Sequence, residues 1–132
     1  MQAISIMRVV PAARDLTGEW RQLLDRHARV MCALEHALES EHSLGVSEFE
    51  VLDRLVADER EGCRIQELAG DVHLSQSALS RVVARLEADG LVERAMCKED
   101  RRGVYARLTD AGRERYAAAR PTHRAVLAEN LA

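Results

Sequence analysis

Apolar residues in the first part of the chain recur every three or four positions. Between residues 15 and 42 they occupy one side of a helical wheel, and charged residues occupy the other side. The stripe consists of Trp20, Leu23, Leu24, His27, Val30, Met31, Leu34 and Leu38. This spacing predicts one long amphipathic helix that buries a single face against another element.

Two shorter helices are predicted after it. In the segment "LGVSEFEVLDRLVADE", Ser47 is the expected N-cap and Glu50 occupies the capping-box position. The apolar contacts of this helix come from Phe49, Val51, Leu52, Leu55 and Val56. Glu61 and Gly62 interrupt the pattern, and the segment "CRIQELAGDV" then predicts about two turns of helix.

Residues 74–94, "LSQSALSRVVARLEADGLVER", predict a helix that continues into a strand. Ser75 is well placed as the N-cap, because a serine oxygen accepts a hydrogen bond from the first turn. Gly90 is the expected left-handed residue after the last turn, from which Leu91 folds back on Leu86. The buried side is expected to hold Leu79, Val82, Val83 and Leu86. The polar side holds Gln76, Ser77, Ser80, Arg81, Ala84 and Arg85.

A β-hairpin and a last helix complete the pattern. The segments "LVERAM" and "VYARLT" are predicted strands, and the charged, glycine-containing "CKEDRRG" is the tip between them. Thr109 caps the final helix, which Pro121 restarts or kinks. A short helix, a tight turn, a second helix and a hairpin describe a mainly α, winged helix-turn-helix fold. The second helix of such a fold enters the major groove of DNA by its N-terminal end, where small polar side chains meet base edges.

Composition and charge are compatible with one DNA-binding domain of this class. The chain has 132 residues, enough for one domain with a core, and its 3% aromatic content favours helix packing over a β-sandwich. The net charge of −3 is unevenly distributed, since residues 64–113 carry 9 Lys and Arg against 8 Asp and Glu, and the remaining residues carry 10 against 14. The acidic excess therefore lies outside the predicted DNA-binding part.

The same residues carry a family resemblance. The segment "LSQSALSRVVARLEADGLVER" followed by "DRRGVYARLTDAGR" closely resembles the multiple-antibiotic-resistance regulator (MarR) family of bacterial transcription factors. Its most specific part is the wing signature, which is Asp100, one residue and Arg102, followed by the "LT" that opens the final helix. The resemblance covers residues 46–113, and the flanking helices match only in character.

By this resemblance, the protein is a homodimeric repressor whose two recognition helices read a pseudo-palindromic, double-stranded DNA operator. The family's contacts in the recognition helix fall on Ser75, Gln76, Ser77, Ser80, Arg81 and Arg85. In the wing, Arg102 matches the arginine that enters the minor groove, and Asp100 matches the carboxylate that holds it. An arginine suits that position because a narrow minor groove has an enhanced negative potential. Lys98 and Arg101 match phosphate contacts.

The resemblance also divides the chain. The parts are an N-terminal arm (1–14), a first dimerisation helix (15–44), the winged domain (46–109, with recognition helix 75–89 and wing 91–109) and a C-terminal dimerisation part (110–132). In the last part, Tyr116, Val126 and Leu127 have no evident home within one protomer, which favours a homodimer. A small, often anionic aromatic effector is expected between the dimerisation helices and the winged domain. The candidate residues for its site are Trp20, His27 and Met31.

Other classes of function compete with this interpretation. Some winged helices bind protein instead of DNA, but the serines of the recognition helix and the arginines of the wing favour DNA. A redox-responsive regulator needs a thiol with a lowered pKa and usually a partner, and Cys97 beside the wing has no evident one. An enzyme is not expected, because the sequence has no Gly-rich phosphate loop, no carboxylate pair of evident geometry and no metal motif. No cofactor is expected either.

Neither a metal nor a membrane is expected as a partner. The spacing of His36, His42 and His123 is not diagnostic, and no two cysteines have the spacing of a structural zinc site. The opening segment, "MQAISIMRVVPAAR", is too short to span a bilayer. The odd number of cysteines, Cys32, Cys63 and Cys97, fits reduced thiols better than disulfides. The expected location is the cytoplasm.

Overall fold

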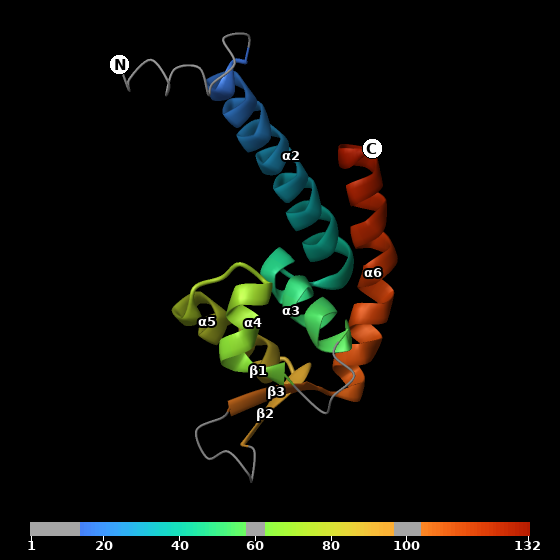
Figure 1. The fold of residues 1–132 in the computed structure, drawn as a ribbon. Coiled ribbons are helices and arrows are strands. Elements are labelled where there is room, and N and C mark those ends of the chain that lie inside the picture. The colour runs from blue at the N-terminus through green and yellow to red at the C-terminus, as the bar shows by residue number, and fades with distance from the viewer. Residues whose placement is uncertain (1–13, 58–62, 97–103) are drawn as a thin grey trace, which may run out of the picture.

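Two long helices and a small winged domain make up the structure, a computed structural model that describes residues 14–57, 63–96 and 104–132. Helices α2 (Leu16–His42) and α6 (Asp110–Leu131) pack on each other and form a stalk (Figure 1). The winged domain at one end of the stalk consists of α3 (Val46–Ala57), α4 (Ile65–Asp71), α5 (Gln76–Ala88) and a three-stranded sheet. The mainly α, winged helix-turn-helix fold expected from the sequence is confirmed.

Helix α2 confirms the predicted amphipathic helix but buries only the C-terminal half of its stripe. Asp15 is the N-cap and accepts a hydrogen bond from the Gly18 amide, and Ser43 ends the helix in the left-handed conformation. The buried side chains of α2 are those of Val30, Leu34 and Leu38. By contrast, the Trp20 and Leu23 side chains are 56% and 58% exposed. The N-terminal part of α2 extends beyond the end of α6 (Figure 1) and has no element of the described chain to cover it.

Helix α3 begins earlier than predicted, so the assignment of Ser47 as its N-cap is wrong. The helix starts at Val46, and the Phe49 amide donates to the Gly45 carbonyl oxygen over 3.0 Å. The Gly45 amide in turn donates to Glu48 Oε1 over 2.8 Å. This is the reciprocal half of a capping box, shifted two residues from the predicted one, and Glu48 rather than Glu50 supplies the carboxylate. The shift places Val46 inside the helix, where its side chain is buried.

Helices α4 and α5 form the helix-turn-helix, and His73 makes the turn between them with a positive φ of 58°. Strands β2 (Val92–Met96) and β3 (Val104–Leu108) pair antiparallel, which confirms the predicted hairpin. A short third strand, β1 (Cys63–Arg64), pairs with the other edge of β3 and is an addition to the prediction. Two residues are too few to show an alternating pattern, so this strand follows from tertiary pairing alone.

Helix α6 is a single helix from Asp110 to Leu131, and the expectation that Pro121 restarts it is wrong. Proline removes one helical hydrogen bond, and the packing of α6 on α2 and α3 outweighs that loss. The same packing overturns a second expectation, because Tyr116 and Val126 are buried within the protomer. Leu127 is partly buried against the same core.

The core of the winged domain fixes α5 on its apolar side. The buried side chains of this region include those of Phe49, Leu52, Leu68, Leu79, Val82, Val83, Leu86, Val92 and Ala106. Because α5 contributes four of them, its opposite face is held toward solvent. Within the described ranges, no helix combines the length and the apolar character that crossing a membrane requires.

Candidate nucleic-acid interface

The N-terminal end of α5 is capped and open to solvent. Ser75 is the N-cap, as predicted, and its Oγ accepts a hydrogen bond from the Ala78 amide over 3.1 Å. Ser77 Oγ lies 3.4 Å from Ser75 Oγ. The side chains of Ser75, Gln76 and Ser77 are all exposed. Unpaired amides at such a helix end carry a partial positive charge, so an anion such as a phosphate is stabilised there.

Gln76 has a partner within the protomer. Its Nε2 donates to the Gln66 carbonyl oxygen over 3.2 Å, which ties the first turn of α5 to α4. The side-chain amide of Gln76 keeps its second N–H and its oxygen, so it can contact a base either in an orientation that preserves this hydrogen bond or after breaking it. The structure gives Gln76 a structural contact that the sequence did not indicate.

The exposed face of α5 continues past the serines. Ser80, Arg81 and Arg85 are exposed and follow Ser77 at intervals of three, four and eight residues, so they lie on one side of the helix. The buried stripe of Leu79, Val82, Val83 and Leu86 lies on the other side, as predicted. The helix thus presents hydroxyl and guanidinium groups on its exposed side, while its apolar side is packed in the core. That they contact DNA stays a prediction.

Arg94 of β2 is a neighbour of this face that the sequence analysis did not single out. Its Nη2 donates to the Ser80 carbonyl oxygen over 3.4 Å, and its Nε lies 3.4 Å from Glu87 Oε1. The side chain therefore links the hairpin to α5. A strand position offers no sequence signal for this role, because the contact depends on how the hairpin packs against the helix.

The junction of α5, the hairpin and α6 explains the residue types of the segment Leu108–Gly112, "LTDAG". Gly90 has a φ of 75°, and the Leu91 amide donates to the Leu86 carbonyl over 2.9 Å, which is the predicted Schellman ending. Thr109 Oγ1 donates to the Gly90 carbonyl over 2.6 Å and accepts from the Gly112 amide over 3.0 Å. One threonine thereby caps α6 and anchors it to the end of α5. The hairpin leaves from this junction.

The predicted contacts Lys98, Asp100, Arg101 and Arg102, and Cys97 beside them, lie outside the described residues. Within the described part of the hairpin, Arg107 of β3 pairs with Glu93 of β2. The distance from Arg107 Nη2 to Glu93 Oε1 is 2.8 Å. This pair is exposed, so its contribution to stability is small, about 0–1 kcal/mol.

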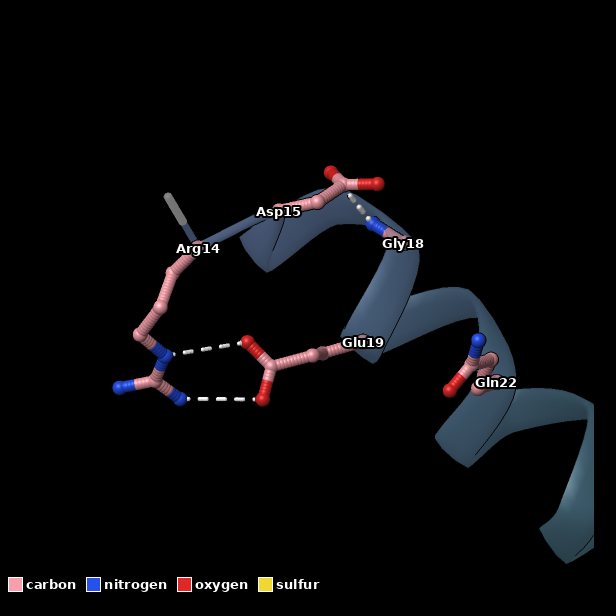
Figure 2. A pocket seen from close by; sticks show the side chains of 5 residues that line it. All are labelled: Arg14, Asp15, Gly18, Glu19 and Gln22. Carbon is pink, nitrogen blue, oxygen red and sulfur yellow. Dashed lines mark hydrogen bonds and ion pairs between the residues drawn. The ribbon is translucent and has the colours of Figure 1, made fainter. Parts of the chain in front are cut away.

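The effector candidates are not gathered into one site within the protomer. Trp20 and His27 are exposed on α2, and Met31 is partly buried against the core. Figure 2 shows a different feature, an open hollow of about 330 Å³ at the N-terminal end of α2. Its charged groups are paired with one another, since Arg14 contacts Glu19 over 3.0 Å and Asp15 caps the helix. None of the three candidates lines this hollow.

Two of the three histidines considered for a metal site have other partners. His42 Nε2 hydrogen-bonds Thr122 Oγ1 over 2.8 Å, and the buried ring of His123 stacks on Phe49. His36 is exposed. Across the parts of the chain that the structure describes, no three His, Cys, Asp or Glu side chains are arranged to hold a metal ion. Cys32 is a free, exposed thiol on α2.

Comparison with known proteins places these features in a family. The MarR family model matches residues 44–104. The uncharacterised HTH-type transcriptional regulator YkoM of Bacillus subtilis (strain 168) is 33% identical over 82 residues, which is 61% of this chain and 52% of YkoM. The chain spans about half the length, or less, of the curated relatives that it matches.

Solved structures match over nearly the whole chain. The MarR family regulator Sco3205 from Streptomyces coelicolor, crystallised in complex with DNA, is 30% identical with a TM-score of 0.82, and the match covers 92% of this chain and 79% of Sco3205. CouR from Rhodococcus jostii RHA1, crystallised with p-coumaroyl-CoA, is 28% identical with a TM-score of 0.76, covering 90% and 82% of the two chains. The protein therefore belongs to the MarR family of transcriptional regulators.

Proposed function

We propose that the protein is a cytoplasmic, homodimeric repressor of transcription that binds a pseudo-palindromic operator through α5 and the wing. The observation that carries this proposal is the exposed polar face of α5, whose apolar side is packed in the core. A helix fixed in this way can place side chains at base edges with little loss of conformational entropy on binding. The DNA-bound state of the similar regulator Sco3205 supports it.

The charges of this face favour a polyanion. The first turn of α5 contains no acidic residue, and Arg81 and Arg85 extend from the exposed side. Neutral serines at the helix end allow close approach to the phosphate backbone, and the two arginines are suited to bidentate contacts with guanine. In the wing, Arg102 held by Asp100 would enter the minor groove, with Lys98 and Arg101 on phosphates.

A second copy of the chain is the proposed cover for the free part of the stalk. The exposed apolar side chains there are those of Leu16, Trp20, Leu23, Leu24 and Leu131. The N-terminal part of α2 and the end of α6 meet where Arg26 Nη2 donates to the Leu131 carbonyl oxygen over 2.9 Å. Exposed apolar side chains therefore lie on both helices of the stalk, and an exposed apolar surface is the usual feature of a subunit interface.

An effector is proposed at the stalk. The candidates Trp20, His27 and Met31 follow one another along α2, from its free N-terminal half to the start of its packed C-terminal half. A second protomer would be needed to enclose them. The aromatic acyl-CoA bound to the similar regulator CouR supports a ligand of aromatic, anionic character.

The test is a gel-shift titration against the DNA upstream of the protein's own gene. We expect Arg81→Ala to weaken binding by roughly 1–3 kcal/mol, about 5- to 150-fold, and to relax the preferred sequence at one position of each half-site. Arg29→Ala, which removes an exposed arginine from α2, is the matched control and should leave both unchanged. A binding-site selection with Arg81→Ala that returns the wild-type consensus at full stringency would contradict the assignment of α5. Failure of the wild type to retard any DNA would favour a protein-binding winged helix instead.

A further inference from the structure

Helix α3 packs against α6 where the winged domain meets the stalk (Figure 1). Polar side chains of the two helices are hydrogen-bonded to each other there. Asp53 of α3 is the centre of these contacts. Its Oδ1 accepts hydrogen bonds from the Tyr116 hydroxyl over 2.5 Å and from Arg124 Nη2 over 3.1 Å. The two donors are eight residues apart on α6, about two helical turns. Because the two donors are about two turns apart on α6 and share one oxygen, a shift of α3 along α6 changes the distance to at least one of them.

Arg124 is itself fixed by a second contact. Its Nη1 donates to His123 Nδ1 over 2.7 Å. A guanidinium has only donors, so Nδ1 is the acceptor, and the ring hydrogen is on Nε2, which faces Glu50 Oε1 of α3 at 3.3 Å. His123 is only 5% exposed and its ring stacks on Phe49, with centroids 4.3 Å apart. The arginine is therefore held between a buried ring on its own helix and a carboxylate on α3.

The apolar contacts of this junction restrain the angle between α3 and α6 less than hydrogen bonds do. Phe49 stacks on Tyr116 with centroids 5.4 Å apart and on His123, and stacked rings tolerate small rotations and shifts. Hydrogen bonds weaken steeply when their angles change. The Asp53, Tyr116 and Arg124 contacts thus add the directional restraint between α3 and α6 that ring stacking lacks.

We propose that Asp53 and Arg124 are positioning residues, which set the orientation of the winged domain on the stalk and thereby the half-site spacing that the dimer accepts. This inference rests on the proposed function, since spacing has meaning only for a dimer on a palindrome. Moving one half-site by a single base pair shifts it by about 3.4 Å and rotates it by about 34°, given one helical turn per 10–10.5 base pairs. A stiff junction rejects such a displaced site, and a loosened junction accommodates it.

The experiment measures binding to a series of duplexes by fluorescence anisotropy. The two half-sites, taken from a binding-site selection, are placed at their selected spacing and with one base pair added or removed, and a single half-site serves as reference. The variants are Asp53→Asn, Arg124→Gln and the conservative Arg124→Lys. Arg54→Gln is the matched control, because Arg54 of α3 pairs with Asp71 of α4 over 3.0 Å, entirely within the winged domain.

For the wild type and Arg54→Gln we expect a loss of at least about 10-fold when the spacing changes by one base pair, the scale of one lost specific contact. Asp53→Asn and Arg124→Gln should reduce this loss to less than about 3-fold while their affinity for the single half-site stays within about 2-fold of wild type, because the contacts in each half-site are unaltered. Arg124→Lys, which keeps the charge but places all its donors on one nitrogen, should give an intermediate ratio.

Folded variants that discriminate spacing as sharply as the wild type would overturn the inference and leave the proposed function intact. If Asp53→Asn and Arg124→Gln fail to fold, Arg124→Lys and Tyr116→Phe carry the same comparison, and wild-type discrimination in both would overturn it. A wild type that binds the single half-site as tightly as the pair would contradict the dimeric function itself, and the inference would fall with it. The two failures are therefore distinguishable.

Discussion

Gly112 offers a sharp test of the junction between α5, the hairpin and α6. A Cβ placed on this residue would lie 2.1 Å from the Leu91 carbonyl oxygen and 3.1 Å from Leu108 Cδ2. The oxygen is not free to retreat, because it accepts the Thr109 amide over 3.1 Å, while the Leu91 amide is bonded to Leu86 over 2.9 Å. Gly112→Ala must therefore push the first turn of α6 away from the end of α5, by more than 1 Å if the contact is to reach about 3.4 Å.

The cost can be assembled from three contributions. Overpacking in a well-packed site costs about 1–3 kcal/mol, and weakening the Thr109–Leu91 hydrogen bond adds about 0.5–1.5 kcal/mol. The higher helix propensity of alanine returns about 1 kcal/mol. We therefore expect Gly112→Ala to lower the free energy of unfolding by about 0.5–3.5 kcal/mol, a drop in Tm of roughly 2–14 °C for a chain of this size.

Gly70→Ala is the matched control, because it is the same substitution in another helix with no atom within 4 Å of the added Cβ. Gly70 is exposed near the C-terminal end of α4, and there alanine should be neutral or stabilising by up to about 1 kcal/mol. Urea unfolding followed by circular dichroism at one fixed protein concentration compares the two, since the proposed dimerisation would make the midpoint depend on concentration. If Gly112→Ala matches the wild type in stability, or if both variants shift the midpoint in the same direction, the steric argument fails.

Three further predictions use other parts of the structure. Gly90→Ala forces alanine into a backbone with a φ of 75° and should cost about 1–2 kcal/mol in urea unfolding, whereas Gly90→Asn should cost less. Burial, and then the hydrogen bond and charge of Asp53, raise the pKa of Tyr116 above 10.0, so the folded chain keeps this proton at a pH where the unfolded chain has lost it. Stability should therefore fall as the pH rises past about 10, and Tyr116→Phe should remove that part of the slope in unfolding titrations between about pH 9 and 11. Leu24→Glu alters a side chain that is 45% exposed, so the circular dichroism spectrum should stay unchanged while light scattering reports a smaller particle. This variant should also fail to bind the operator, and an unchanged dimer would contradict the proposed interface.

The elements that could be predicted are those fixed by neighbours in sequence. Ser75, Gly90 and Thr109 each act on amides or carbonyls within a few residues, and each was placed correctly because such caps have strong residue preferences. Gly45 and Ser47 show where this reasoning fails. Both precede a glutamate by three residues, so two overlapping caps compete locally, and the burial of Val46 decides between them.

Contacts between distant residues could not be predicted. Asp53 and Tyr116 are 63 positions apart, and neither belongs to a motif that would pair them. Arg94 reaches Ser80 only because the hairpin folds back beside α5. Pro121 predicted a break in the last helix, but local helix propensity is a weak constraint where a long helix packs along most of its length. The candidate interface was therefore predictable as a list of α5 side chains, and the contacts that orient it were not.

The stripe of α2 shows why periodicity alone does not reveal quaternary structure. Apolar spacing is continuous from Trp20 to Leu38 in the sequence, and a repeat of this kind reports which side chains avoid water, not which chain covers them. The structure divides the stripe, since Leu34 and Leu38 are buried within the protomer while Trp20 is exposed. Tyr116, assigned to the dimer from sequence, is also buried within the protomer. The apolar surface of the stalk that a second copy could cover therefore lies on the N-terminal half of α2 and the end of α6, and a substitution tests the dimer only if it is made there.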